Sequence, residues 1–498
     1  MKVQIFILFV VFCFISSNTL QAQVKSENGT WAYKKSLRDM VPDKWYLTAP
    51  AIIRVKLKKD SGTSGLSLDS LKLDAQLDSI AKQGYNGIEI FATPYGGRSY
   101  GGLDAIDRYR IDPAAGTMDD FKRLVRQAHR KKLAVIAFDN LGYCSIDAPH
   151  FLKACDDINK GKISRETKWF IWADSSTAKP PQIPDTYYLG GSKRWEKWVY
   201  SPRANKYYWS KWEGFDKDGN PCSLPQYDWS PEWQQEVKNL MHFWMNTGID
   251  GMVVDAVNWY INYTWQIGKE CITDIIASYG NTFIQPEGAG GFHEDPVPWI
   301  TDGGWNCVQN YGLGIWWEKE NRILFNAIEK NNPTGVEEAL QIYRDRVVAE
   351  GGILYIGADT RITEPSKYHF YVALCIATGH LYCKSATRVG SLGMDTTLAW
   401  IFNLKKDHTA FEQLSIRQNL NTNDDNKFYA FIQKAKSTNE RLLCVFNFQT
   451  SEQQITIDMS GVNAVSFLDL ANSQPVKYTK QLQLALPSYG YRFYKIIQ

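Results

Sequence analysis

Four carboxylates stand where short apolar segments end, and these are the residues whose type and placement could do chemistry. Asp139 follows Leu-Ala-Val-Ile-Ala-Phe, Asp255 follows Gly-Met-Val-Val, Glu287 follows Phe-Ile-Gln-Pro, and Asp359 follows Leu-Tyr-Ile-Gly-Ala. An ionised carboxylate at the end of an apolar strand is costly unless it is paired or used. A single one is more often a loop-capping residue, but four on one rim indicate a shared site for nucleophilic and acid–base chemistry.

The elements that must position these carboxylates alternate between apolar strands and amphipathic helices over residues 50–410. The predicted strands are 52–57, 87–91, 133–138, 251–254, 282–284, 307–310, 353–356 and 380–383; the clearest predicted helices are 71–83, one that begins after the N-cap Thr117, 233–246 and 264–279. Eight strands with intervening helices predict an α/β fold, a closed (β/α)8 TIM barrel whose site lies at the carboxyl ends of the strands. An open doubly wound sheet is the alternative, but no glycine-rich phosphate loop follows any strand.

Segments outside this alternation predict further parts. Residues 1–22 combine Lys2, an apolar run from Ile5 to Ile15 and a small, polar end, the pattern of an export signal too short to span a bilayer. Residues 23–49 are an N-terminal extension, and residues 140–225 are an irregular subdomain inserted after the third strand. Residues 411–498 predict a C-terminal antiparallel β-sandwich. The protein is therefore expected to be exported, periplasmic or secreted, without a membrane span.

Composition limits the expected partners. The 56 basic and 53 acidic side chains nearly cancel and no basic run stands out, so nucleic acid is not an expected partner. The 18 Trp and 27 Tyr residues suit the flat faces of sugars, although large cores also use aromatic rings. The cysteines form no Cys-x-x-Cys motif, so zinc and redox motifs are absent, while Cys144 and Cys155 could form a disulfide in an oxidising compartment.

Ordered blocks of this sequence resemble the α-amylase superfamily. Residues 231–260, PEWQQEVKNLMHFWMNTGIDGMVVDAVNWY, are similar to its helix and nucleophile strand, FIQPEGAGG to its acid/base strand, LYIGADTRI to its third-carboxylate strand, and residues 106–142 to the stretch that ends in the first motif. KWFIWADSSTAKPPQIP and LPQYDWSPEW resemble the α-glucosidase branch, with oligo-1,6-glucosidase and trehalose synthase. ERLLCVFNF and LPSYGYRFY resemble its C-terminal sandwich.

The resemblance implies a retaining glycoside hydrolase or transglycosylase that acts on α-linked oligosaccharides or polysaccharides. Asp255 would be the nucleophile, Glu287 the general acid/base and Asp359 the transition-state stabiliser, with Asp139 and Arg361 in support. Retention implies about 5–5.5 Å between the first two carboxyl groups.

Several positions depart from the family's pattern. The Arg that stands two residues before the nucleophile in the family is Val253 here, and the His before the third carboxylate is Ala358. Tyr143 and Cys144 replace the Asn-His pair of the first motif, and Leu103 replaces the Tyr that stacks on the reacting glucose. Loss of the Arg removes a positive charge beside Asp255, which should raise the pKa of that carboxyl.

Two readings of these departures remain open. In one, the enzyme is active on a different glycosyl unit, and Asn258, Trp259, Tyr95 and Arg98 line a rebuilt pocket. In the other, the site has decayed and the protein binds a sugar or a partner without cutting; a purely structural scaffold is a third option. No cofactor is expected. Calcium is not supported by the motifs, since DKDGNP (216–221) reads as an ordinary Asp-Gly turn.

Overall fold

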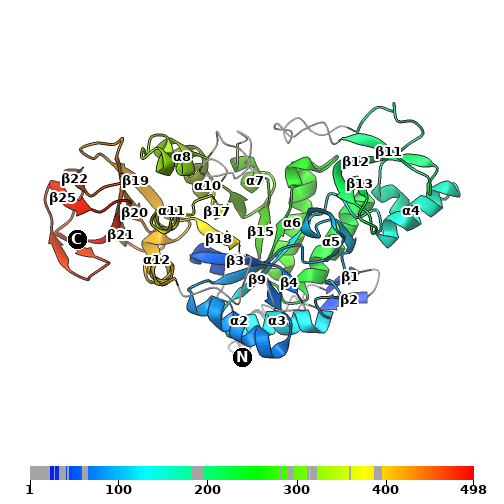
Figure 1. Cartoon of the computed structure of the whole chain (residues 1–498), viewed down its shortest axis with the longest axis horizontal. Helices are drawn as coiled ribbons and strands as arrows, with labels where there is room; N and C mark the ends of the chain where they lie inside the picture. Colours follow the sequence, from blue (N-terminus) through cyan, green and yellow to red (C-terminus); the bar gives the residue numbers. More distant parts are fainter. Residues whose placement is uncertain are drawn as a thin grey trace, which may run out of the picture.

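The computed structural model describes residues 23–26, 29–32, 41, 44–58, 65–181, 196–280, 282–288, 295–310, 313, 322–357, 361–385 and 395–498. The predicted export signal, residues 1–22, and the predicted site residue Asp359 lie outside these ranges. Figure 1 shows a central barrel, with the C-terminal sheets on one side and the inserted subdomain on the other. No helix within these ranges is long and apolar enough to cross a bilayer.

Eight strands form the central sheet, and every hydrogen-bonded pair in it is parallel. They are β3 (Ala51–Val55), β6 (Gly87–Ile90), β9 (Ala134–Asp139), β14 (Gly251–Val254), β15 (Phe283–Pro286), β16 (Cys307–Gln309), β17 (Ile353–Gly357) and β18 (Leu381–Ser385). The spatial order runs from β15 through β14, β9, β6, β3, β18 and β17 to β16. Asn306 links the two ends of this order, because its side chain accepts from Ile284 N at 2.9 Å and donates to Thr282 O at 2.6 Å. The predicted (β/α)8 barrel is confirmed.

Alternation along the strands divides the apolar core into two layers. On β9, Ala134, Ile136 and Phe138 belong to the cluster inside the barrel, whereas Val135 and Ala137 belong to the cluster under the helices. Both faces of the strand are buried, which explains why the sequence shows a continuous apolar run here rather than an alternating one.

The N-terminal extension closes the base of the barrel. Trp45 and Tyr46 lie on the short helix η2 (Trp45–Leu47), and both are buried. Their rings pack on Phe283 at the start of β15, with centroids 5.8 and 5.9 Å apart. Before this plug, β1 (Gln23–Ser26) and β2 (Gly29–Ala32) form an antiparallel pair.

Helices surround the barrel. They are α2 (Ser70–Lys82), α3 (Met118–Arg130), α5 (Pro231–Met245), α6 (Trp265–Tyr279), α7 (Val297–Thr301), α8 (Ile323–Glu329), α9 (Val336–Ala339), the π-helix η8 (Leu340–Asp345), α10 (Arg346–Ala349), α11 (Pro365–Ala377) and α12 (Thr396–Asp407). The predicted cap Thr117 accepts from Asp120 N at 3.2 Å, and Asp120 accepts from Thr117 N at 2.9 Å, a reciprocal capping box. Helix α5 begins two residues earlier than predicted, because Ser230 caps it and Pro231 fits its first turn.

The inserted subdomain is more regular than predicted. After α4 (Pro149–Asn159) and η4 (Glu166–Trp169), an antiparallel sheet forms from β10 (Trp172–Ala173), β11 (Lys197–Ser201), β12 (Lys206–Phe215) and β13 (Pro221–Pro225). The long strand β12 pairs with each of the other three. Smaller elements near the rim are β4 (Leu57–Lys58), β5 (Leu66–Ser67), β7 (Tyr95–Gly96), η3 (Ser99–Gly101), β8 (Ala105–Asp107) and η7 (Val257–Trp259).

The chain ends in a predicted β-sandwich, which the structure contains. After η9 (Thr409–Phe411), six strands form one antiparallel sheet: β19 (Ile416–Leu420), β20 (Phe428–Lys434), β21 (Arg441–Asn447), β26 (Tyr491–Ile497), β23 (Ser466–Asp469) and β24 (Pro475–Lys477). The pair β22 (Gln453–Asp458) and β25 (Gln481–Leu486) covers the apolar core of this sheet. Each of the eight cysteines that follow the signal carries a free thiol, so Cys144 and Cys155 are not bridged here.

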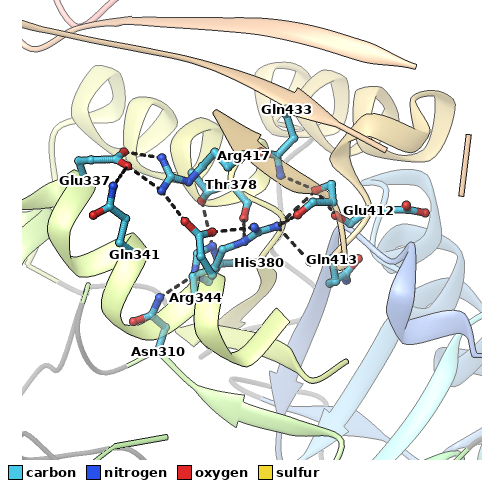
Figure 2. Close-up of polar contacts among 12 residues, drawn as sticks. Asn310, Glu337, Gln341, Arg344, Thr378, His380, Glu412, Gln413, Arg417 and Gln433 are labelled. Carbon is cyan, nitrogen blue, oxygen red and sulfur yellow. Dashed lines mark hydrogen bonds and ion pairs between the residues drawn. The ribbon is translucent and has the colours of Figure 1, made fainter. Parts of the chain in front are cut away.

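A buried arginine joins the barrel to the C-terminal sheet (Figure 2). Arg344 on η8 donates to Thr378 O at 2.9 Å, to Gln413 O at 3.1 Å and to Ser415 O at 2.6 Å. Asp345 accepts from Arg344 at 2.9 Å and from Arg417 of β19 at 2.7 Å. The Arg344 side chain is only 1% exposed, so these partners, rather than water, must stabilise its buried charge.

Replacing this arginine should destabilise the fold. In Arg344→Met three buried carbonyls lose this donor and Asp345 keeps only Arg417, so we expect the free energy of unfolding to fall by about 3–5 kcal/mol in urea titrations. Arg346→Met is the matched control. Its half-exposed side chain pairs with Asp295, and its loss should change stability by about 0.5 kcal/mol or less. Equal effects in both variants would contradict the role given to Arg344.

Candidate active site

Parallel pairing brings the predicted carboxylates to one rim. Strand β14 lies between β9 and β15, and Val254 is level with both Asp139 and Pro286. Asp255 N donates to Asp139 O at 2.8 Å, and Glu287 N donates to Val254 O at 2.7 Å. Asp139, Asp255 and Glu287 therefore leave the sheet side by side at the carboxyl end of the barrel, while Asp359 lies outside the described residues.

The side chains of Asp255 and Glu287 face each other within hydrogen-bonding reach. Both retain some solvent contact, yet protein surrounds them. Burial, followed by repulsion from Glu287, raises the pKa of Asp255 well above its ordinary value, and the hydrogen bond from Asn140 and the charge of Arg54 oppose the rise. A negative charge so near Asp255 disfavours its ionised form, which adds to the effect of burial.

Asn140 holds Asp255 in place from the end of β9. Its Nδ2 donates to Asp255 Oδ2 at 2.8 Å. Its Oδ1 accepts from Gly142 N at 2.7 Å and from Tyr143 N at 3.2 Å, which fixes the orientation of the amide. The Asn140 side chain is a rigid donor that stabilises the ionised form of Asp255.

Backbone geometry positions Glu287. Its Oε2 accepts from Ala256 N at 3.0 Å, and Ala256 has a φ of 53°, an uncommon left-handed conformation next to the candidate nucleophile. Gly288 has a φ of 90°, and a Cβ there would lie 2.3 Å from Asn258 Oδ1. Only glycine fits directly after Glu287, because both the turn and the buried Asn258 exclude a side chain.

Asp139 supports the site from behind. It follows Val135 and Ala137 in the alternation of β9, so its side chain turns away from the barrel interior. It is buried and pairs with Arg108, whose Nη1 lies 2.5 Å from Asp139 Oδ1. Arg108 also donates to Tyr143 O at 2.5 Å. This ion pair fixes the loop that carries Asn140, and it does not reach the carboxylate pair directly.

The other predicted site residues lie around the rim at different depths. Asn258 is buried, and Trp259 is half-buried. Arg361 lies over the Phe325 ring of α8, 4.0 Å from its centroid. Tyr95 packs under Arg110, 5.0 Å from its centroid, and Arg98 is exposed and close to Gly219 in the insert. Of these, Asn258 and Trp259 are the closest along the chain to the carboxylate pair.

Four aromatic rings from separate segments beyond the strand ends contact one another and form an aromatic wall. We define it as Tyr100, Tyr143, Trp212 and Trp259. Ring centroids are 5.8 Å apart for Trp212 and Trp259, 5.9 Å for Tyr100 and Trp212, and 6.2 Å for Tyr143 with either Tyr100 or Trp212. Buried Lys211 places Nζ 4.0 Å from the Trp259 centroid, and burial lowers the pKa of this lysine to about 8.

Sequence reasoning missed Asn140, Arg54, Tyr100 and Trp212. A polar residue straight after the apolar strand β9 was a signal for Asn140. Arg54 interrupts an apolar strand and was an equally readable signal. Tyr100 and Trp212 come together only because the loop after β6 and the inserted sheet fold toward each other, so local patterns could not single them out.

The DKDGNP segment forms the turn that joins β12 to β13. Asp216 Oδ1 accepts from Asp218 N at 2.9 Å and from Asn220 N at 2.8 Å. Its carboxylate is therefore engaged by its own turn. Within the part of the chain that the structure describes, no group of three or more His, Cys, Asp or Glu side chains is arranged to hold a metal ion.

Two family models match the chain, one over part of the barrel with the insert and one over the C-terminal sheets. The catalytic domain of α-amylase matches residues 74–287, and the C-terminal domain of maltogenic amylase matches residues 418–493. A "Probable alpha-glucosidase" of Rhizobium meliloti is 27% identical over 44% of this chain and 38% of its own length. A trehalose synthase of Thermus thermophilus is 30% identical over 31% of this chain and 14% of its own length.

A solved structure agrees with the fold. The α-amylase of H. orenii superposes with a TM-score of 0.68 over 90% of this chain and 99% of its own, at 17% sequence identity. The two family models, which together match more than half of the chain, show that it belongs to the α-amylase superfamily of glycoside hydrolases. The alignments span less than half the length of the two relatives named above.

The raised pKa of Asp255 predicts a stability effect. Above the pKa of an unfolded Asp, about 4, the unfolded chain releases this proton more readily than the folded state does, so stability falls as the pH rises through the interval between the two pKa values. Asp255→Asn removes this cost, so we expect its Tm to exceed that of the wild type at pH 7 and the difference to shrink as the pH falls toward 4. Asp174→Asn, at an exposed position, is the control; a lower Tm for Asp255→Asn at pH 7 would contradict the electrostatics described here.

Proposed function

We propose that this protein is a retaining glycoside hydrolase, or a transglycosylase, that acts on α-linked oligosaccharides. The observation that carries the proposal is the placement of Asp255 and Glu287 side by side at the carboxyl end of the barrel, where Glu287 lies near enough to raise the pKa of Asp255. Retaining cleavage needs such a pair: one carboxylate to attack and one carboxylic acid to protonate the leaving group.

In the first step an ionised Asp255 oxygen attacks the anomeric carbon while the bond from that carbon to the leaving oxygen breaks. Glu287 gives its proton to the leaving oxygen, so the first product departs as a neutral alcohol. In the second step Glu287, now a carboxylate, takes a proton from water or from a sugar hydroxyl, whose oxygen displaces Asp255. Water gives hydrolysis and a sugar hydroxyl gives transfer.

Retaining enzymes place the two carboxyl groups about 5–5.5 Å apart, so that a glycosyl unit meets both of them. In this arrangement Asp255 would face the anomeric carbon of the bound glycosyl unit and Glu287 would face the leaving oxygen. The rigid amide of Asn140 and the backbone N–H of Ala256 hold each partner from behind during the reaction. We also propose that the protein acts outside the cytoplasm, because residues 1–22 have the pattern of an export signal.

Substitution of each carboxylate should give a distinct kinetic signature. We expect Asp255→Asn to abolish turnover of every glycoside that the wild type cleaves. Glu287→Gln should lower kcat by about 10²–10⁴-fold for sugar leaving groups, and by much less for nitrophenyl glycosides, which leave without protonation. NMR of the first-formed sugar should show the α-anomer. Wild-type turnover that both substitutions leave unchanged would mean that the activity arises elsewhere, and no turnover in any of the three proteins would indicate a binding protein.

The aromatic wall predicts where the sugar chain lies. Trp212→Ala should raise KM for oligosaccharides by about 2- to 13-fold, equivalent to about 0.5–1.5 kcal/mol of ring stacking, with kcat little changed. Trp198→Ala is a matched control, because Trp198 lies in the same subdomain and contacts Trp209 rather than the wall. A KM that responds equally to both substitutions would place the substrate elsewhere.

A further inference from the structure

A groove lies at the junction of the barrel and the C-terminal sheet. It is lined by the first turns of α11 and α12 and by residues 487–492, which lead into β26. Figure 1 shows α11 and α12 between the central strands and the C-terminal sheets. The groove has a volume of about 460 Å³, which falls within the range of about 300–1,000 Å³ that is usual for ligand sites.

The groove lies at the same end of the barrel as Asp255 and Glu287. Helices α11 and α12 follow β17 and β18, and in a (β/α)8 barrel each helix begins at the end where its strand finishes. Their first turns therefore lie at the carboxyl end of the strands. In the sheet, β18 is separated from β14 by β3, β6 and β9, so the groove lies around the rim from the carboxylate pair and is not part of that site.

Two aromatic side chains form a platform in the groove lining. Trp400 comes from α12 and Tyr491 from β26, and their rings are near-parallel, with centroids 6.4 Å apart and an interplanar angle of 27°. Both residues are half-buried, and the buried ring of Phe493 lies 6.3 Å from the Trp400 centroid and 5.6 Å from the Tyr491 centroid. Because a helix of the barrel packs here on a strand of the C-terminal sheet, the platform is held by both parts.

Polar side chains line the groove beside the platform. Arg492 is 41% exposed, and its ion pair with Asp469 is long, at 3.9 Å. Its Nη1 donates to Tyr491 O at 3.2 Å, which keeps the guanidinium next to the platform while its other N–H groups can reach a ligand. Hydroxyl groups come from Ser366, Thr396, Thr397 and Ser488.

A histidine in the lining is held in a fixed orientation. His369 Nε2 lies 2.8 Å from Asp395 Oδ2. The other oxygen of that carboxylate accepts from Leu398 N at 3.0 Å, where Asp395 caps α12. The cap therefore fixes the carboxylate, and the carboxylate fixes the imidazole at the edge of the groove.

This combination of groups suits a sugar. The faces of a pyranose ring carry C–H groups, which pack on the electron-rich faces of Trp and Tyr rings. Its hydroxyls donate and accept hydrogen bonds, as do the Ser and Thr hydroxyls, and a guanidinium donates to them. No carboxylate belongs to the described residues that line the groove, so nothing there selects for a cation.

We propose that this groove is a second carbohydrate site, which binds α-linked oligosaccharide chains without cutting them. The inference goes beyond the proposed function and rests on it only for the linkage of the sugar. A chain held in the groove raises the concentration of substrate at the rim, because both sites lie at the same end of the barrel.

The test is ¹⁹F NMR of the full chain labelled with 5-fluorotryptophan, in the Asp255→Asn background so that the sugar is not consumed. The probes are maltoheptaose and isomaltoheptaose. The Trp400 signal, assigned by its loss in Trp400→Phe, should shift with at least one probe. Its titration curve should be separate from that of Trp212, which is assigned in the same way with Trp212→Phe.

Substitutions in the groove should weaken only the Trp400 titration. We expect Tyr491→Ala to raise the Kd read from the Trp400 signal by about 2- to 13-fold through loss of ring stacking. Arg492→Gln should raise it by about 2- to 13-fold through loss of a hydrogen bond. Arg492 is partly exposed, so this second variant keeps the test valid if Tyr491→Ala disturbs the fold.

Two controls accompany these variants. Arg441→Gln should leave the Kd unchanged, because Arg441 lies in β21 of the same sheet and donates to Asn463 O outside the groove. In the catalytically intact chain, Arg492→Gln should raise KM for a long α-glucan and leave kcat/KM for a disaccharide unchanged, since a disaccharide is too short to occupy both sites.

A Trp400 signal that neither probe moves at up to about 10 mM would overturn the inference. A Kd that both Tyr491→Ala and Arg492→Gln leave unchanged would overturn it as well, because the shift would then arise elsewhere. Failure of the proposed function looks different. In that case the sugar moves the Trp400 signal, while the Trp212 signal stays fixed and the wild type turns over no glycoside.

Discussion

Two carboxyl groups forced into contact at the end of neighbouring parallel strands are the constraint on which this site depends. The register of β14 against β15 leaves Asp255 and Glu287 side by side, and the fold must then hold an electrostatically unfavourable pair. Asn140, the backbone N–H of Ala256 and the charge of Arg54 all oppose that repulsion. The loop after β9 orients the first of these donors, since the Asn140 amide is itself fixed by the N–H groups of Gly142 and Tyr143.

Much of the fold could be predicted because its signals are local. Continuous apolar runs such as Val135–Phe138 mark strands buried on both faces, and Thr117 with Asp120 marks the start of a helix. The order of the carboxylates along the chain then placed Asp255 and Glu287 on the rim. These features depend on neighbours within a few residues, which a sequence displays directly.

The surroundings of the carboxylates could not be predicted, because they depend on contacts between distant segments. Arg54 and Tyr355 are 301 positions apart, and Tyr100 meets Trp212 only because a loop and an inserted sheet fold toward each other. The departures at Val253 and Leu103 indicated that the pocket differs from the family's pattern, but not which residues replace the missing groups. The inserted sheet was also underestimated, since its pairing is set by the long strand β12 rather than by turn signals.

The buried guanidinium of Arg344 has a consequence for how the chain is divided. Its acceptors Gln413 and Ser415 belong to the segment that leads into the C-terminal sheet, and Gln413 also donates to Ala49 O beside the basal plug. A barrel severed after α12 would leave the Arg344 cation without its acceptors Gln413 O and Ser415 O, and Ala49 O without its donor. The C-terminal sheet is therefore part of the same cooperative folding unit as the barrel. The sequence alone suggests two separable domains, but the contacts of Arg344 and Gln413 join them.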